Sequence, residues 1–266
     1  MKSDEIKSLF TYSCYHTESR LGEQFVGEHA LTYQIAGNLS LSDGKTTVIS
    51  KPNSVILVKR NNLLKFVKTP PQGADFESIS LRFSQDLLRK ISLEYNFKVK
   101  TTTNESAPVV QLKVNDLLNA FITSLLAYHK SYKSLSTAIV ELKIKEAVLT
   151  LIETKPSLTN VLFNFSDPHK INLEAYMNQN FHFNVSMDRF AYMTGRSLAT
   201  FKRDFEKIYG TTPGKWLVHK RLQAAHFLIK EQHKNASEIY LDLGFEDLSH
   251  FSYAFKKEFG KAPSRV

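Results

Sequence analysis

Two different hydrophobic periods divide the chain. Between residues 30 and 83, short segments rich in Val, Ile, Leu, Phe, Tyr and Thr are separated by turn residues, and several of them alternate apolar and polar positions. Asp43-Gly44 is typical of a two-residue hairpin loop, because Gly accepts the positive φ that such a turn requires. Closely spaced short strands of this kind predict a β-sandwich or a small barrel.

From residue 114 onward the hydrophobic period changes to about 3.6. Segments 114–129 and 134–153 place apolar residues three and four positions apart, with Leu117 in the first apolar stripe and Leu142 in the second, and Asn115 is available to cap the first segment. These segments predict a helical hairpin. Its apolar stripe either packs on its own domain or joins two chains in a homodimer, and the pattern leaves both open. Residues 155–170 contain two prolines and little periodicity, which indicates a linker.

An internal repeat occupies the last hundred residues. Phe201, Phe205, Tyr209, Gly210 and Pro213 recur fifty positions later, and the matching residues are Phe251, Phe255, Phe259, Gly260 and Pro263. Aromatic residues at i, i+4 and i+8 lie on one face of a helix, and the glycine is suited to a left-handed C-cap. Two equivalent helices are therefore predicted, each with an apolar face in a core.

A short helix and a glycine turn precede each aromatic helix. The first short helix follows Ser186 and ends at Gly195, and the second follows Asn235, with a capping box to Glu238, and ends at Gly244. Ser197 and Asp247 are natural N-caps for the aromatic helices. A short helix, a tight turn and a second helix form a helix-turn-helix, whose second helix enters the major groove of DNA.

If the aromatic residues point inward, polar side chains face outward and can contact DNA. Arg203 can donate two hydrogen bonds to guanine, and Lys202 can reach a base or a phosphate. Basic residues near the helix ends can neutralise backbone phosphates; these are Arg196, Lys207, Lys256 and Lys257. About 20 residues of helical pattern after Thr212 make a rod of about 30 Å, which fits the ~34 Å repeat of the major groove.

Composition excludes several other classes of protein. One cysteine, Cys14, allows no internal disulfide and no cysteine-rich zinc site. The net charge of +9 is spread over the chain, since residues 171–266 hold 14 basic against 10 acidic residues and the rest holds 21 against 16. The start of the chain lacks an apolar signal core and no apolar run reaches eighteen residues, so we expect a cytoplasmic protein.

The C-terminal segments RSLATFKRDFEKIYGTTPGKWLVHKRLQAAHFLI and LGFEDLSHFSYAFKKEFGKAPS, with MDRFAYMTG before them, resemble the AraC/XylS family of bacterial regulators. The resemblance implies two helix-turn-helix subdomains, transcriptional control, often activation, and contact with RNA polymerase. By position, it implies base contacts from seven residues: Ala199, Lys202, Arg203, Ser249, His250, Ser252 and Tyr253. Tyr240 replaces a usual small residue and Tyr253 a frequent arginine, so we expect the first unit to carry more of the specificity.

The N-terminal half resembles, weakly, the cupin-like jelly-roll domains of the same family. Only the isolated His16 and His29 are present where a cupin metal site needs a His-x-His pair, so no metal or other cofactor is predicted. Five residues are candidates to line an effector cavity: His29, Tyr33, Lys59, Arg60 and Arg82. Metabolite sensing would require an enclosed pocket, whereas a protein partner would require an exposed apolar patch.

The predicted architecture is therefore multidomain α+β. It consists of a cupin-like sensory β domain (1–112), a helical hairpin (113–154), a linker (155–170) and an all-α DNA-binding domain with two helix-turn-helix units (171–266). An effector, either a small molecule or a protein, would control it. The remaining alternative, a DNA-repair enzyme that accepts an alkyl group on Cys14, has only His16 nearby in the sequence to activate the thiol, so no enzyme activity is expected.

Overall fold

The computed structural model describes residues 9–20, 24–99, 107–128 and 135–266. The chain forms two compact parts, here called the N-terminal half, up to residue 166, and the C-terminal half, from residue 167, with Gln24 and Phe25 grouped with the latter. No helix in the described ranges is long and apolar enough to cross a membrane. The prediction of a sheet domain followed by a helical domain is thereby confirmed in outline.

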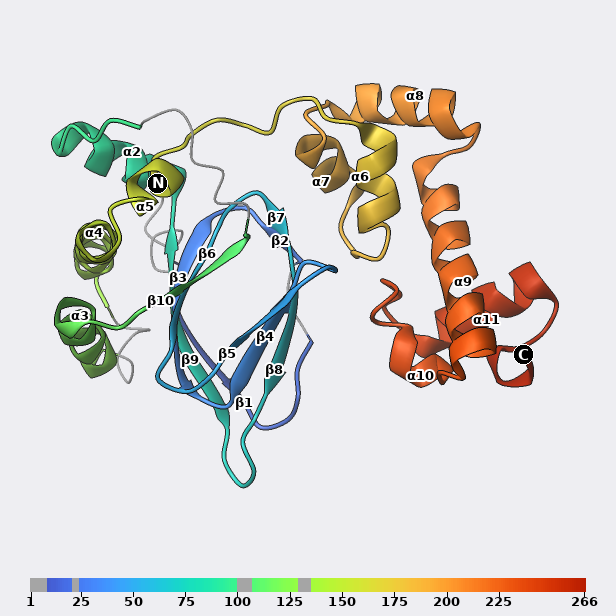
Figure 1. Ribbon diagram of the computed structural model, residues 1–266, viewed down its shortest axis with the longest axis horizontal. Helices are drawn as coiled ribbons and strands as arrows, with labels where there is room; N and C mark the ends of the chain where they lie inside the picture. Colours follow the sequence, from blue (N-terminus) through green and yellow to red (C-terminus); the bar gives the residue numbers. More distant parts are fainter. Residues whose placement is uncertain (1–8, 21–23, 100–106, 129–134) are drawn as a thin grey trace. The chain divides into compact units, whose positions relative to one another are not determined.

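The N-terminal half is built on antiparallel strands (Figure 1). A five-stranded sheet has the order β1-β9-β3-β6-β10, a three-stranded sheet has the order β5-β4-β8, and β2 pairs with β7. The strands are β1 (Phe10–Tyr15), β2 (Phe25–Val26), β3 (His29–Ala36), β4 (Asn38–Ser42), β5 (Thr47–Ser50), β6 (Val55–Val58), β7 (Asn62–Leu63), β8 (Lys65–Thr69), β9 (Phe76–Phe83) and β10 (Val109–Leu112).

The predicted hairpin at Asp43-Gly44 is confirmed. Strands β4 and β5 pair in antiparallel register from Leu39↔Ser50 to Ser42↔Thr47, and Gly44 has φ +85°. The Asp43 carboxylate accepts hydrogen bonds from the amides of Lys45 and Thr46 at 2.9 and 2.7 Å, which closes the turn. Burial is the largest single influence on the pKa of Asp43 and raises it. The hydrogen bonds from the turn together outweigh burial, so the pKa is lowered.

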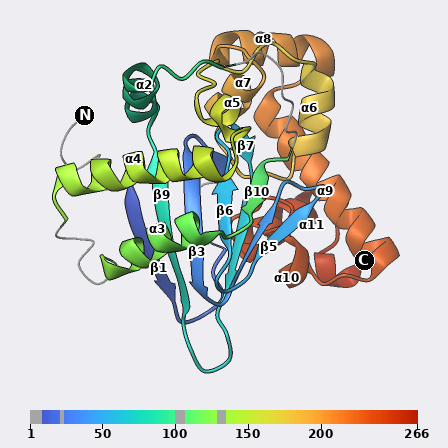
Figure 2. The same ribbon diagram turned by 60° about the vertical axis from the view of Figure 1, so that its left-hand side comes forward.

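Helices cover one face of the five-stranded sheet. They are α2 (Gln85–Glu94), α3 (Asp116–Ala127), α4 (Thr137–Thr154) and α5 (Leu158–Leu162). Figure 2 shows α3 and α4 lying side by side against this face, and residues such as Leu118, Phe121 and Val148 join the sheet residues Leu57 and Leu81 in one core. A second core between the sheets contains Leu41, Ile56 and Phe76. The sheet is therefore buried on both faces.

The predicted linker 155–170 needs correction over its first part. Residues 158–162 form α5, and Leu158, Leu162 and Phe163 are buried in the helix-facing core of the N-terminal half. Pro156, which indicated a linker, lies just before this short helix and does not interrupt it. Only the residues after 166 fall in the C-terminal half.

From residue 167 onward, the regular elements of the C-terminal half are all helices. Its elements are α6 (Leu173–Asn180), α7 (Met187–Met193), α8 (Leu198–Tyr209), α9 (Pro213–Gln232), α10 (Ala236–Ile239), α11 (Leu248–Phe259) and a 3-10 turn, η2 (Pro263–Arg265). Helices α8 and α11 each have twelve residues and begin fifty positions apart, as the sequence repeat predicts. The long α9 runs between them (Figure 1).

Candidate nucleic-acid interface

The first helix-turn-helix consists of α7 and α8. The hydroxyl of Ser197 accepts a hydrogen bond from the amide of Thr200 at 3.3 Å and caps α8, which ends at Gly210 with φ +65°. In the turn, Gly195 has φ +65°, and a Cβ there would overlap the carbonyl group of His169. Only glycine fits this turn without displacing the backbone of residues 169–170.

Helix α8 has one buried and one exposed face. Phe201 and Phe205 are fully buried, in agreement with the prediction that the aromatic stripe forms core. The opposite face exposes Ala199, Lys202, Arg203 and Lys207. The Arg203 side chain is 77% exposed, and its guanidinium lies 3.6 Å from the carboxylate of Asp204. These side chains are therefore exposed to solvent.

The second helix-turn-helix consists of α10 and α11, and its first helix is shorter than predicted. The carboxylate of Glu238 accepts a hydrogen bond from the amide of Asn235 at 3.1 Å, so the predicted capping box is present. Regular helix stops at Ile239, however, and turns continue to Gly244, which has φ +86°. Tyr240 is half-buried and packs against the core of this unit, which therefore accommodates the larger side chain.

Helix α11 repeats the division seen in α8. Phe251 and Phe255 are fully buried, and Asp247 caps the helix by accepting a hydrogen bond from the amide of His250 at 2.6 Å. The exposed side chains include those of Ser249, His250, Tyr253, Lys256 and Lys257, whereas Ser252 is half-buried. Tyr253 is 69% exposed, so a large aromatic ring stands in the middle of this face.

Arg196 does not have the role that the sequence predicted. Its side chain is only 7% exposed, and its nitrogens donate to the carbonyls of Ile171 and Thr194 and to the carboxylate of Asp204, at 3.0, 2.7 and 3.1 Å. A buried guanidinium with these partners cannot reach a DNA phosphate. The hydrogen bond from Arg196 lowers the pKa of Asp204, and the charges of Lys170 and Arg203 act in the same direction.

A second arginine, Arg221 in the middle of α9, is buried and was not predicted from the sequence. It donates three hydrogen bonds to backbone carbonyls, and burial lowers its pKa to about 10, so it stays charged at neutral pH. A signal was present, because position 221 lies four residues from both Leu217 and Ala225, which are buried on the same helix face. An arginine on an apolar stripe indicates a buried hydrogen-bonding role.

The five candidate effector residues do not converge on one cavity. In the register of β3 and β9, His29 pairs with Phe83 and Ala30 with Arg82, so His29 and Arg82 point to opposite faces of the sheet. Tyr33 donates to the side chain of Asn53 at 2.9 Å. Arg60 donates to the carbonyls of Asn164 and Ser166 at 2.7 and 2.9 Å. Lys59 is buried. The predicted cavity is therefore not formed by these residues.

His29 is a buried neutral group. Its Nδ1 accepts a hydrogen bond from the amide of Arg60 at 3.2 Å. Burial, reinforced by the charges of Arg60 and Lys59, lowers the pKa of His29 to about 3. The imidazole is therefore uncharged at neutral pH and holds the residue 60 loop against β3.

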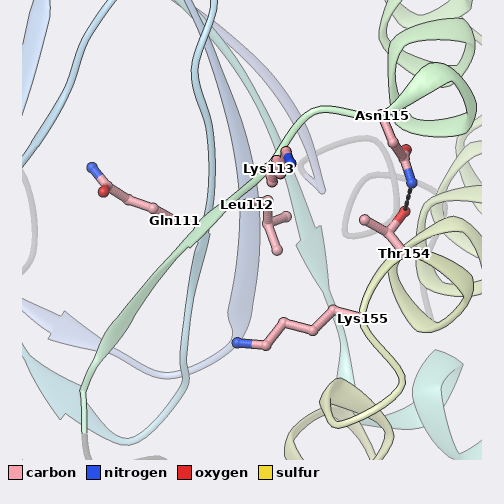
Figure 3. A pocket seen from close by; sticks show the side chains of 6 residues that line it. All are labelled: Gln111, Leu112, Lys113, Asn115, Thr154 and Lys155. Atoms are coloured by element: carbon pink, nitrogen blue, oxygen red, sulfur yellow. Dashed lines mark hydrogen bonds between the residues drawn. The ribbon is translucent and has the colours of Figure 1, made fainter.

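A pocket of about 390 Å³ lies elsewhere in the N-terminal half, where β10 leads into α3 (Figure 3). The amide of Asn115 donates to the hydroxyl of Thr154 at 3.4 Å across one wall, and the side chain of Lys155 extends from the end of α4 into this region. None of the predicted effector residues lines it; the lining residues are Gln111, Leu112, Lys113, Asn115, Thr154 and Lys155.

Cys14 is not an activated nucleophile. Its thiol donates to the carboxylate of Asp75 at 3.6 Å, and Asp75 also accepts from His16 at 2.6 Å. Desolvation, the hydrogen bond to Asp75 and its negative charge raise the pKa of Cys14. A nucleophilic cysteine needs the opposite shift.

Comparison with known proteins assigns both halves. Residues 190–266 match the model of a helix-turn-helix domain, and residues 29–161, half of the chain, match the ExsA N-terminal regulatory domain. The transcriptional regulator ExsA of Pseudomonas aeruginosa is 23% identical over 90% of this chain and 85% of its own. The transcriptional activator RhaS of Escherichia coli is 31% identical over 49% of this chain and 46% of its own.

Among solved structures, an apo variant of ToxT from Vibrio cholerae aligns over 97% of this chain and 96% of its own, with a TM-score of 0.44 and 14% identity. The matched proteins are regulators, so the chain is not an enzyme and the DNA-repair alternative is abandoned. The AraC/XylS resemblance of the C-terminal segments is confirmed. The chain belongs to the AraC/XylS family of DNA-binding transcriptional regulators.

Proposed function

We propose that this regulator reads a bipartite DNA site by placing α8 and α11 in successive segments of the major groove on one side of the duplex. The observation that carries the proposal is the pair of matched, exposed faces on two twelve-residue helices joined by the 20-residue α9. A helix of that length spans about 30 Å, close to the ~34 Å between successive major-groove segments.

The exposed residues of the two helices take different roles. Arg203 reads a guanine through two hydrogen bonds, and Lys202 and Ala199 contact neighbouring bases or phosphates. On α11 the base contacts come from Ser249, His250, Ser252 and Tyr253, of which Tyr253 can offer only one hydroxyl and an aromatic face. Lys207, Lys256 and Lys257 neutralise phosphates, and the first unit supplies more of the specificity.

We infer that the protein activates transcription in the cytoplasm through contact with RNA polymerase. RhaS, which matches the C-terminal part, is named as an activator, and DNA-bound regulators act where the chromosome is. The test is a reporter gene driven by the selected operator. If the protein is an activator, its loss should lower transcription of the reporter. If the protein is a repressor, its loss should raise transcription of the reporter.

We propose that the N-terminal half is a cupin-like domain that receives the regulatory signal. The two sheets enclose an apolar core, as in a jelly roll, and the matched model is that of a regulatory domain. The pocket beside β10 is the candidate effector site. Lys113 and Lys155 among its lining residues suit a small anionic ligand, and its position beside the ends of α3 and α4 would transmit occupancy to the hairpin.

A protein effector is the second candidate for this signal. Large apolar side chains are exposed at and just after the end of α2, namely those of Leu93, Tyr95 and Val99. An exposed apolar cluster is a feature of surfaces that bind other proteins. Substituting Leu93 by Glu should abolish control by a protein effector and leave control by a small anion intact.

Selection of binding sites from random duplex DNA tests the proposal directly. The intact protein and a fragment of residues 165–266 would be compared at two salt concentrations. We expect both to recover two half-sites about one helical turn apart, ~34 Å. Recovery of only non-specific, salt-sensitive binding by both forms would overturn the proposal.

A further inference from the structure

Arg221 connects three separate segments of the C-terminal half. Its Nε donates to the carbonyl of Phe181, its Nη2 to that of Phe183, and its Nη1 to that of Gly244, each at 2.8 Å. Phe181 and Phe183 lie in the loop between α6 and α7, ahead of the first helix-turn-helix. Gly244 lies in the turn of the second, and Arg221 itself is in the middle of α9.

The guanidinium is buried at this junction, with only 9% of the residue exposed. Its planar arrangement of five N–H donors allows three carbonyls in different directions to be satisfied by one side chain. A lysine carries its charge on one nitrogen and cannot reproduce this fork. Because unpaired buried carbonyls are unfavourable, the three segments are held at fixed distances from one another.

The surroundings of Gly244 show how closely the segments are packed. A Cβ at this position would lie 2.8 Å from Cζ of Arg221 and 2.9 Å from the carbonyl oxygen of His182. Nearby, the side-chain amide of Asn184 donates to the carboxylate of Glu246 at 3.0 Å. The loop between α6 and α7 therefore contacts the turn of the second helix-turn-helix through two independent connections.

We propose that Arg221 is a positioning residue that fixes the second helix-turn-helix relative to the first and thereby sets the half-site spacing that the protein accepts. The proposal rests on the bipartite reading proposed above. Without cross-connections, helix α9 would join the units at only one end of each and would leave the second unit free to pivot where the helix ends. Arg221 donates three hydrogen bonds across this junction, beside the single one between Asn184 and Glu246, and so opposes the pivoting.

Rigid and flexible connections between two binding modules have different consequences. When both modules are held at the spacing of the DNA site, binding of one presents the other at high effective concentration. A loosened connection lowers that concentration at the optimal spacing and raises tolerance of other spacings. Each helix still recognises its own half-site, because α8 and α11 keep their exposed faces.

The test uses the full-length protein with Arg221→Met and Arg221→Lys, and Lys230→Met as the control. Lys230 is an exposed residue of the same helix, so its replacement removes the same charge without touching the junction. Affinities are measured for the complete site, for each half-site with the other scrambled, and for sites with base pairs inserted between the halves.

Arg221→Met should lose at least about tenfold in affinity for the complete site while each half-site affinity changes by less than about twofold. The affinity of Arg221→Met should also depend less on the number of base pairs between the half-sites. Arg221→Lys should lie between Arg221→Met and the parent in both measurements, and Lys230→Met should match the parent protein. Equal losses for the half-sites and the complete site would mean that Arg221 only supports folding, and would overturn the proposal. A spacing profile that stays as sharp as that of the parent would do the same.

A measurement without DNA separates this inference from the bipartite reading itself. Spin labels at Lys207→Cys and Lys257→Cys, with Cys14→Ser to remove the native thiol, report the distance between α8 and α11. The distance distribution should be narrow in the parent and broad with Arg221→Met. If it broadens while the parent shows no preference for paired half-sites, the bipartite reading fails and the role of Arg221 stands. An unchanged narrow distribution overturns the role of Arg221.

Discussion

Arg203 and Arg196 approach the same carboxylate, that of Asp204, from different environments. Arg203 is exposed on α8 and directs its guanidinium to solvent, whereas Arg196 is buried against backbone carbonyls. Replacing Arg203 by Ala should weaken specific DNA binding by about 1–3 kcal/mol and relax the preference at one base pair. Site selection with this variant measures both, and an unchanged motif would remove Arg203 from the readout.

Arg196→Ala should act on folding and not on DNA contact. It leaves two carbonyls and the Asp204 carboxylate without their donor, so the free energy of unfolding should fall by about 2–4 kcal/mol. Lys207→Ala is the matched control. It should leave the free energy of unfolding unchanged and reduce the slope of the logarithm of the DNA-binding constant against the logarithm of salt concentration by about 1. Urea titration measures the stability of the two variants, and DNA binding at several salt concentrations measures the slope. A reduced salt slope for Arg196→Ala would contradict its structural role.

His29 makes the stability of the N-terminal half depend on pH. Its pKa is about 3 in the folded protein and 6.5 in an unperturbed histidine, so between these values the unfolded chain binds a proton that the folded protein does not. Stability should therefore fall as pH decreases from 6.5, at up to about 1.4 kcal/mol per pH unit. His29→Gln should flatten this part of a stability-against-pH curve, and an equally steep curve in the variant would show that His29 is not responsible.

At the scale of single residues, the sequence predicted which residues form the aromatic stripes, because burial follows helical spacing. The roles of Arg196 and Arg221 could not be predicted in the same way. Their partners are main-chain carbonyls brought close by tertiary packing, and a carbonyl has no residue-specific signal in a sequence. The effector candidates are not brought together for a related reason, since the pairing register of β3 and β9 turns His29 and Arg82 to opposite faces.

At the scale of elements, glycines with the same backbone conformation have different importance. Gly195 and Gly210 both have φ +65°, but an added Cβ would meet the backbone of residues 169–170 at Gly195 and nothing within 4 Å at Gly210. Gly210→Ala should cost about 1–2 kcal/mol, the strain of a left-handed residue. Gly195→Ala should cost more, by about 2 kcal/mol or above. Equal unfolding free energies for the two variants would contradict the close packing at Gly195.

Element boundaries were predicted well where the local signals were strong and poorly where packing decides. The caps at Ser197 and Asp247 and the capping box at Asn235 were recognised from side-chain type alone. The end of α10 at Ile239, and the existence of β1, β10 and α2, were not recognised. Strand β10 has four residues and pairs with β6, which is far away in sequence, so its local pattern carries little information.

At the scale of the whole molecule, the helical hairpin leaves two leucines exposed, which the sequence had included in its apolar stripe. Leu117 of α3 is 47% exposed and Leu142 of α4 is 57% exposed, while Phe121 and Leu125 are buried. The stripe that packs on the sheet is therefore rotated from the predicted one. We propose that the exposed leucines contribute to a homodimer, since apolar surface that the domain does not bury is available to a second copy.

The double variant Leu117→Glu, Leu142→Glu tests this proposal. Sedimentation should give the intact protein a mass of two 30.4-kDa chains and the variant that of one, because charges in an apolar interface are unfavourable. Leu93→Glu is the matched control, as Leu93 is 83% exposed outside the hairpin, and it should leave the mass unchanged. Binding to one bipartite site should be similar in all three, because one chain carries both recognition helices. A parent protein that sediments as a monomer at micromolar concentration would reject the dimer and leave the bipartite reading intact.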